Sequence, residues 1–138
     1  MKTLIIEHPW NILLPRKTKE DKKISFSLNV ILNLHYMQYN QAKKIVLSWL
    51  EEYLKETNQS NIKFTKRVKV TFKVYKPTRR KTDKSNFYSG ASKIIYDALV
   101  ELGVLIDDND DYISVETLEE TEHNKDNPRL YFKFEEIE

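Results

Sequence analysis

The sequence predicts a small α+β domain, with a mixed sheet and two main helices packed on it. Three observations support this fold class. Residues 62–74 alternate between apolar and cationic or polar side chains, as in a strand with one buried face. Residues 40–55 and 86–102 repeat apolar side chains at three- and four-residue steps, as amphipathic helices do. The whole chain, residues 1–138, is long enough for one ordinary hydrophobic core and too short for two.

Shorter patterns complete the expected order of elements. Residues 3–7 are a candidate first strand, and the second helix can be capped by Asp83 or Ser85 and ended by Gly103. Apolar alternation near residues 113–115 and 130–134 predicts two further strands, which we expect to pair as an antiparallel hairpin. The order strand, helix, strand, helix, strand, strand favours the α+β class.

Composition excludes several classes of function. The chain has no cysteine, which excludes disulfides, thiolate metal sites and cysteine nucleophiles. No stretch approaches the roughly 18 apolar residues of a membrane span, so we expect a cytoplasmic protein without a membrane partner. Gly90 and Gly103 are the only glycines, and they cannot form a phosphate-cradling loop, so we expect no nucleotide cofactor.

Charge is divided unevenly along the chain, although the net charge is only +2. Residues 61–84 hold a single acid and ten basic residues: Lys63, Lys66, Arg67, Lys69, Lys73, Lys76, Arg79, Arg80, Lys81 and Lys84. Such density is typical of a surface that binds a polyanion. Candidate DNA contacts are Lys69, Lys73, Arg79, Arg80, Lys81 and Lys84. The alternative is a solvated sheet face with scattered lysines.

Acidic and amide side chains then follow the second predicted helix. Asn86, Gly90, Lys93 and Asp97 lie at steps of four, three and four, so they share one face, roughly opposite the apolar stripe. Asp83 lies just before the first turn. After Gly103 the chain delivers Asp107 and Asp108, and if this segment returns alongside the helix, carboxylates from two elements converge.

Convergent carboxylates predict a site for a hard divalent cation. They repel one another unless a cation lies between them, and oxygen ligands suit Mg²⁺ or Mn²⁺. Such an ion can promote phosphodiester hydrolysis, with Lys93 countering the charge that develops on the phosphate. The alternatives are an exposed Lys93–Asp97 salt bridge and a solvated acidic turn at residues 107–111.

Residues 93–108 also carry a family resemblance. Lys93, the Asp97-Ala-Leu triplet four residues later, Gly103 and the closing Asp107-Asp108 pair resemble, without a gap, the signature of the RusA family of Holliday junction resolvases. Ser27-Leu28-Asn29, then His35-Tyr36 and a lysine-rich amphipathic helix, are similar to the usual opening of that family. The basic cluster before Asp83 corresponds as well.

The resemblance implies a homodimeric α+β endonuclease that binds four-way DNA junctions and nicks two opposed strands with Mg²⁺ or Mn²⁺. It implies a protein of bacteria, their prophages or phages. Asp83 and Asn86 match the first acid and the asparagine of one motif, Lys93 matches the catalytic lysine, and Asp108 matches an essential acid. Asp83, Asp107 and Asp108 are then the expected metal ligands, with Asp97 as a further candidate, and Asn86 is an expected DNA contact.

The chain departs from the family pattern in one place. Ser85 stands where a second motif acid is expected, and roughly one extra helical turn separates Asn86 from Lys93. Asp97, or an acid within residues 107–111, could supply the missing oxygen. Two alternatives remain: a junction-binding protein without catalysis, and a nuclease acting on other branched DNA.

Overall fold

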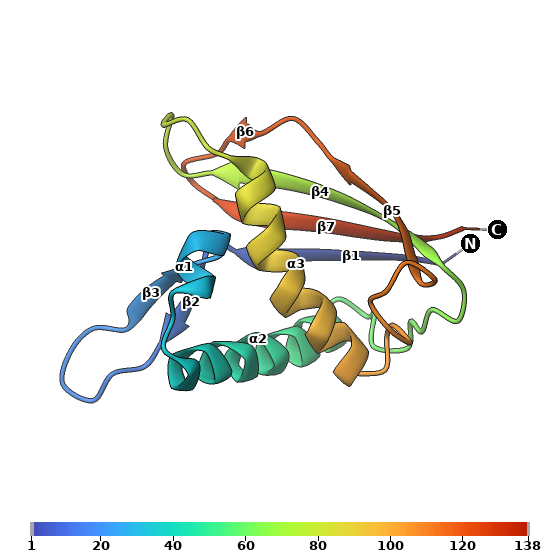
Figure 1. The fold of residues 1–138 in the computed structure, drawn as a ribbon, viewed down its shortest axis with the longest axis horizontal. Helices are drawn as coiled ribbons and strands as arrows, with labels where there is room; N and C mark the ends of the chain where they lie inside the picture. The colour runs from blue at the N-terminus through green and yellow to red at the C-terminus, as the bar shows by residue number, and fades with distance from the viewer. Residues whose placement is uncertain (1, 138) are drawn as a thin grey trace.

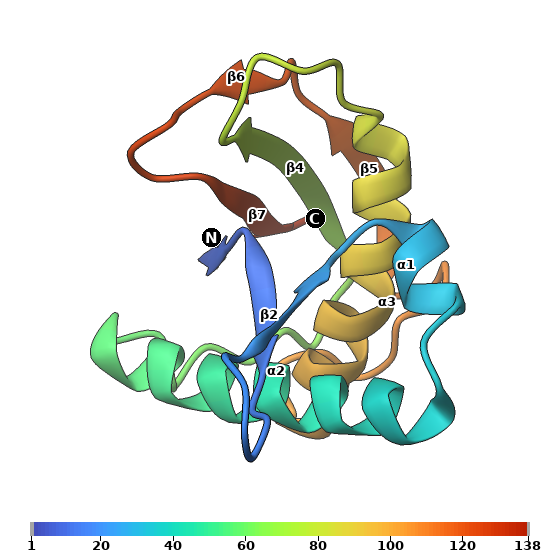
Figure 2. The same cartoon turned by 90° about the vertical axis from the view of Figure 1, so that its left-hand side faces the viewer.

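In the computed structural model, which describes residues 2–137, the chain forms a five-stranded sheet, a two-stranded sheet and three helices. The strands are β1 (Thr3–Pro9), β2 (Asn11–Leu14), β3 (Lys22–Ser25), β4 (Val68–Lys76), β5 (Ile113–Leu118), β6 (Glu122–His123) and β7 (Arg129–Glu136). The helices are α1 (Leu28–Leu32), α2 (Tyr36–Glu56) and α3 (Lys84–Glu101). Helix α3 lies across the sheet (Figure 1), and α2 packs against α3 and β2 at the bottom of the molecule (Figure 2). The predicted α+β class and mixed sheet are confirmed.

The large sheet has the strand order β1-β7-β4-β5, and the short β6 also pairs with β4. Strand β7 is antiparallel to both β1 and β4, whereas β5 runs parallel to β4. The expected hairpin between the last two long strands is therefore wrong, because β4 lies between β5 and β7. The reason is α3, which carries the chain back to the start of β4, so that the next strand must run parallel to it.

Strand β4 begins later than its alternating pattern suggests. Residues 62–67 are outside the strand, although Phe64 is buried like the apolar positions of β4. The backbone amide of Phe64 donates to the carbonyl of Val104, at 2.8 Å, so this segment pairs with the turn after α3. Alternation thus continues past the end of the ladder because burial, and not strand pairing, sets the pattern.

Local signals place the helix ends. Asp83 caps α3, since its side chain accepts a hydrogen bond from the amide of Asn86, and Gly103 follows the helix with a left-handed φ of 77°. Asn58, with φ 58°, plays the same part after α2. Helix α2 starts before the expected residue 40, because the side chain of His35 caps it by accepting from the amide of Met37. Within residues 2–137, none of the helices is long and apolar enough to cross a membrane.

The backbone of α3 packs closely on the segment between β3 and α1. A Cβ at Gly90 would lie 1.8 Å from the carbonyl oxygen of Phe26 and 2.9 Å from the amide nitrogen of Leu28. One turn earlier, the side-chain amide of Asn86 donates to the hydroxyl of Ser27, at 2.6 Å. The expectation that the Asn86–Asp97 face lies opposite the buried side is therefore wrong near Gly90, because that face is covered by residues 26–28.

Two side chains cover the outer edge of β1: Tyr53, which belongs to α2, and Gln59, which comes shortly after α2. The amide of Gln59 donates to the carbonyl of Ile5 and its oxygen accepts from the Ile5 amide, both at 2.9 Å. The hydroxyl of Tyr53 accepts from the amide of Glu7, at 3.1 Å. These contacts satisfy backbone groups that an edge strand would otherwise leave to water.

One histidine, His8 of β1, is buried against aromatic side chains. His8 is 4% exposed and packs against Phe26 and Trp49, with ring centroids 4.9 Å and 4.3 Å away. Its Nδ1 lies 2.7 Å from the carbonyl oxygen of Pro9, to which the neutral ring donates. Burial lowers the pKa of His8 to about 4, because the charged ring would lose its hydration.

We expect Gly90→Ala to destabilise the fold by about 3 kcal/mol, because the new methyl group would press on backbone atoms that cannot move independently. Urea unfolding followed by circular dichroism measures the change. Ser89→Ala, at the exposed neighbouring position, is the matched control and should shift stability by no more than about 0.5 kcal/mol. A Gly90→Ala protein as stable as the wild type would contradict the close packing.

Stability should fall as pH drops from about 6.5 to about 4. The unfolded chain protonates His8 near its ordinary pKa while the folded chain keeps it neutral, so the contribution is fully present above that range. We expect a loss of about 2–3 kcal/mol between pH 7 and about pH 4.5. Urea unfolding at both pH values should show a smaller difference in His8→Phe. Any loss of stability that His8→Phe causes at both pH values cancels in this difference. If stability depends on pH equally in the two proteins, His8 is not the group responsible.

Candidate functional site

The predicted site residues lie at both ends of α3. Asp83 and Asn86 are at its first turn, Asp97 is near its last turn, and Asp107 and Asp108 follow the turn made by Gly103. Fourteen residues of helix at 1.5 Å each separate Asp83 from Asp97 by about 21 Å. Within one chain, Asp83 therefore does not share a site with the other carboxylates.

The acids at the C-terminal end of α3 do lie close together. Partial burial raises the pKa of Asp108, and a hydrogen bond with Asp107 and the charge of Asp97 raise it further. Asp107 accepts from the amide of Asp108, at 2.7 Å, and from the side chain of Asn109, at 3.2 Å. The charge of Asp97 on the helix thus reaches Asp108 in the turn that follows it, whereas a shared site for Asp97, Asp107 and Asp108 stays a prediction.

Lysines from two helices flank these acids. Lys93 is exposed one turn before Asp97, but Asp97 forms its ion pair with Lys43 of α2, at 3.5 Å. Both members of that pair are partly exposed, at 37% and 43%. Lys93 instead borders an apolar hollow formed with Leu32, Leu34 and Tyr36. Lys43 was not among the predicted site residues, because nothing in the local pattern of α2 reveals its partner on α3.

Two tyrosines of α3, one near each end of the helix, meet beside the parallel strand β5. The hydroxyls of Tyr88 and Tyr96 lie 2.6 Å apart. Burial raises the pKa of both, and contacts with Glu116 of β5 raise them further. The charge of Asp108 also raises the pKa of Tyr96. The eight-residue spacing of the tyrosines marks one helix face, but Glu116 could be found only once β5 was known to pair with β4.

The basic loop lies at the opposite end, beside Asp83. Arg79, Arg80 and Lys81 are exposed between β4 and α3. Lys76 donates to the carbonyl of Arg80 at 3.0 Å, which holds the loop against the end of β4. Lys84 donates to the carbonyl of Glu119, also at 3.0 Å. The loop can thus present three cations to a polyanion, but far from Asp108.

Acids from neighbouring strands balance the predicted cationic face of β4. Lys69 is opposite Glu135 of β7 in the strand register. Lys73 pairs with Glu122, at 3.3 Å, and contacts the ring of Tyr75. Although desolvation lowers the pKa of Lys73, its hydrogen bond with Glu122 raises the pKa above the ordinary value. Lys73 is therefore a weaker candidate for DNA contact than the loop, whereas Lys69 stays a candidate with an acid as its cross-strand neighbour.

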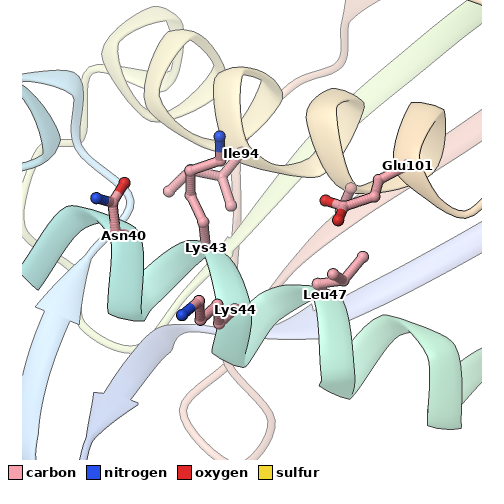
Figure 3. A pocket seen from close by; sticks show the side chains of 7 residues that line it. Asn40, Lys43, Lys44, Leu47, Ile94 and Glu101 are labelled. Carbon is pink, nitrogen blue, oxygen red and sulfur yellow. The ribbon is translucent and has the colours of Figure 1, made fainter.

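A groove runs between α2 and α3 and ends near Asp97. Its volume is about 280 Å³. Figure 3 shows Asn40 and Lys43 pointing from α2 toward α3, Lys44 in front of α2, and Ile94 and Glu101 on the α3 side. Leu47 and Ala98 complete the lining. Amide and ammonium donors thus surround an apolar floor.

Metal-ligand geometry is incomplete in one chain. Among residues 2–137, no group of three or more histidine, aspartate or glutamate side chains is arranged to hold a metal ion. Carboxylate oxygens nevertheless suit Mg²⁺, which is usually held by one or two carboxylates together with water and substrate phosphates. Asp97 and Asp108 would provide the one or two carboxylates that such a Mg²⁺ site needs.

Comparison with known proteins adds no family assignment. No protein-family model matches this sequence, and no curated protein matches it. The resemblance to the RusA family therefore rests on the residues quoted above, chiefly positions 93–108.

Proposed function

We propose that the protein is a metal-dependent endodeoxyribonuclease that acts as a homodimer on four-way DNA junctions and resolves them by paired nicks. The observation that carries this proposal is the acidic turn after α3, where the charge of Asp97 reaches Asp108 and Lys43 lies 3.5 Å from Asp97. The resemblance of residues 93–108 to the RusA signature supplies the substrate class. Mg²⁺ or Mn²⁺ is the proposed cofactor.

The dimer has a specific part in this proposal. Asp83 lies about 21 Å from Asp97 in its own chain, too far to share an ion with it. If two α3 helices lie antiparallel about a twofold axis, Asp83 of one copy approaches Asp97 and Asp108 of the other. The exposed side of α3, which includes Ser85, Ser89 and Lys93, is available for such packing. Two equivalent sites would result, as paired nicks require.

Each group then has a defined task. The ion, when bound, supplies a polarised water for attack on the phosphodiester. Asp108 and Asp97, together with Asp83 of the second copy, would hold the ion, while Lys93 would face the charge that develops on the phosphate. Arg79, Arg80 and Lys81 contact phosphates of an adjoining arm, which positions the DNA without reading its bases.

One observation favours a second candidate, junction binding without cleavage. Two of the predicted metal ligands already have protein partners, since Asp83 caps α3 and Asp97 pairs with Lys43. Both contacts are exposed and weak enough to be exchanged. A gel shift without nicking in Mg²⁺ or Mn²⁺ would support this candidate, and nicking of flaps in preference to four-way junctions would indicate another branched substrate.

Asp108→Asn should reduce nicking of a synthetic four-way junction at least about 100-fold, because it removes a charge needed to hold the ion. Junction binding in EDTA should stay within about twofold, since the carboxylate makes no favourable contact with a phosphate. Asp83→Asn should behave in the same way and keep the helix cap, because asparagine caps as well as aspartate does. Gel shifts and denaturing gels with junction, flap and linear duplex measure both properties.

The matched control is Asp126→Asn, an exposed acid in the turn before β7, which should nick like the wild type. Wild-type nicking by Asp108→Asn or Asp83→Asn would remove that residue from the site.

Mixing the two inactive variants distinguishes a shared site from a site within one chain. A heterodimer of Asp83→Asn with Asp108→Asn has one site with both substitutions and one with neither, if each site takes Asp83 and Asp108 from different chains. Remixed subunits should therefore recover about a quarter of the wild-type sites, giving single nicks. No recovery after verified subunit exchange would place both residues in the same chain's site, or in no common site.

A further inference from the structure

The groove between α2 and α3 offers hydrogen-bond donors that the proposed site does not yet use. Asn40, Lys43 and Lys44 contribute an amide and two ammonium groups on the α2 side (Figure 3). Glu101 also lines the groove, but Figure 3 shows it near Leu47, at the end away from Asn40. An anion near Asn40 and Lys43 would therefore meet donors and avoid the carboxylate.

We propose that this groove binds a phosphate of the DNA strand next to the cleavage site, with Lys43 as its main contact. The inference rests on the proposed nuclease function and deepens it. It assigns a local phosphate contact to α2, whereas the sequence placed the basic DNA-contact candidates in residues 69–84 and the catalytic cation at Lys93.

Position is the first argument. Lys43 lies 3.5 Å from Asp97, whose charge in turn acts on Asp108, so the groove adjoins the proposed catalytic acids directly. The loop at Arg79–Lys81 precedes Asp83, at the start of α3. The length of α3 therefore separates this loop from Asp97 by at least about 20 Å. Cations in that loop can hold another part of the junction, but cannot hold the phosphate beside Asp108 of the same chain.

The second argument is that the ion pair between Lys43 and Asp97 is weak. An exposed lysine–carboxylate pair is worth about 0–1 kcal/mol, so a phosphate can replace Asp97 at little cost. The ammonium group is also 5.7 Å from the centre of the Tyr39 ring, which keeps the side chain directed along the groove. Asp97 thus holds Lys43 near the position where a phosphate would need it, and competes with that phosphate.

If Asp97 and a DNA phosphate compete for Lys43, substitutions of Lys43 and of Asp97 should change the affinity for the junction in opposite directions. Lys43→Met should weaken junction binding in EDTA about 3- to 10-fold and reduce the slope of log affinity against log salt by about 1, the effect of one lost phosphate contact. Asp97→Asn should strengthen metal-free binding, because it releases Lys43. In the double variant, the gain from Asp97→Asn should disappear. Fluorescence anisotropy with a labelled four-way junction over a range of salt concentrations measures all three.

Lys55→Met is the matched control, since it removes the same charge from the exposed far end of α2 and should leave the salt slope unchanged. An unchanged slope in Lys43→Met, or additive effects of the two substitutions, would overturn the groove assignment. If Asp108→Asn still abolishes nicking in that case, the nuclease proposal stands without it. If the wild type binds no branched DNA even at low salt, both proposals fail.

Discussion

The close contact between α3 and residues 26–28 constrains the rest of the structure. Because Gly90 has no side chain, the helix backbone can approach the carbonyl of Phe26, while the opposite side of α3 packs on the sheet through Ile95 and Leu99. The helix is therefore fixed between the N-terminal segments and the strands. Its length then sets the distance between Asp83 at one end and Asp108 beyond the other, and with it the need for a second chain in the proposed site.

Signals that act over a few residues were readable from the sequence. Alternation located β4, and the three- and four-residue periodicity located α2 and α3. Asp83 and Gly103 marked the ends of α3, because a cap and a left-handed glycine act on their immediate neighbours. The effect of Asp97 on Asp108 arises from the same local turn, whereas the three-acid metal site stays a prediction.

Contacts between distant segments could not be read in this way. The parallel pairing of β5 with β4 depends on where α3 returns the chain, so the sequence suggested a hairpin instead. Lys43 and Glu116 belong to the site only because α2 and β5 lie beside α3. The separation of basic and acidic blocks along the chain was also misleading, since pairing of β4 with β7 brings Lys69 opposite Glu135.

Gln59 limits how copies of this chain can associate. Its side-chain amide occupies both backbone hydrogen-bonding groups of Ile5, and Tyr53 occupies the next amide along β1. A strand from another molecule would have to displace these contacts before it could extend the sheet at this edge, which protects the chain against fibrillar growth through β1. Addition of a strand at β1 would thus break three hydrogen bonds before it formed a new one, so this edge is poorly suited to association between copies.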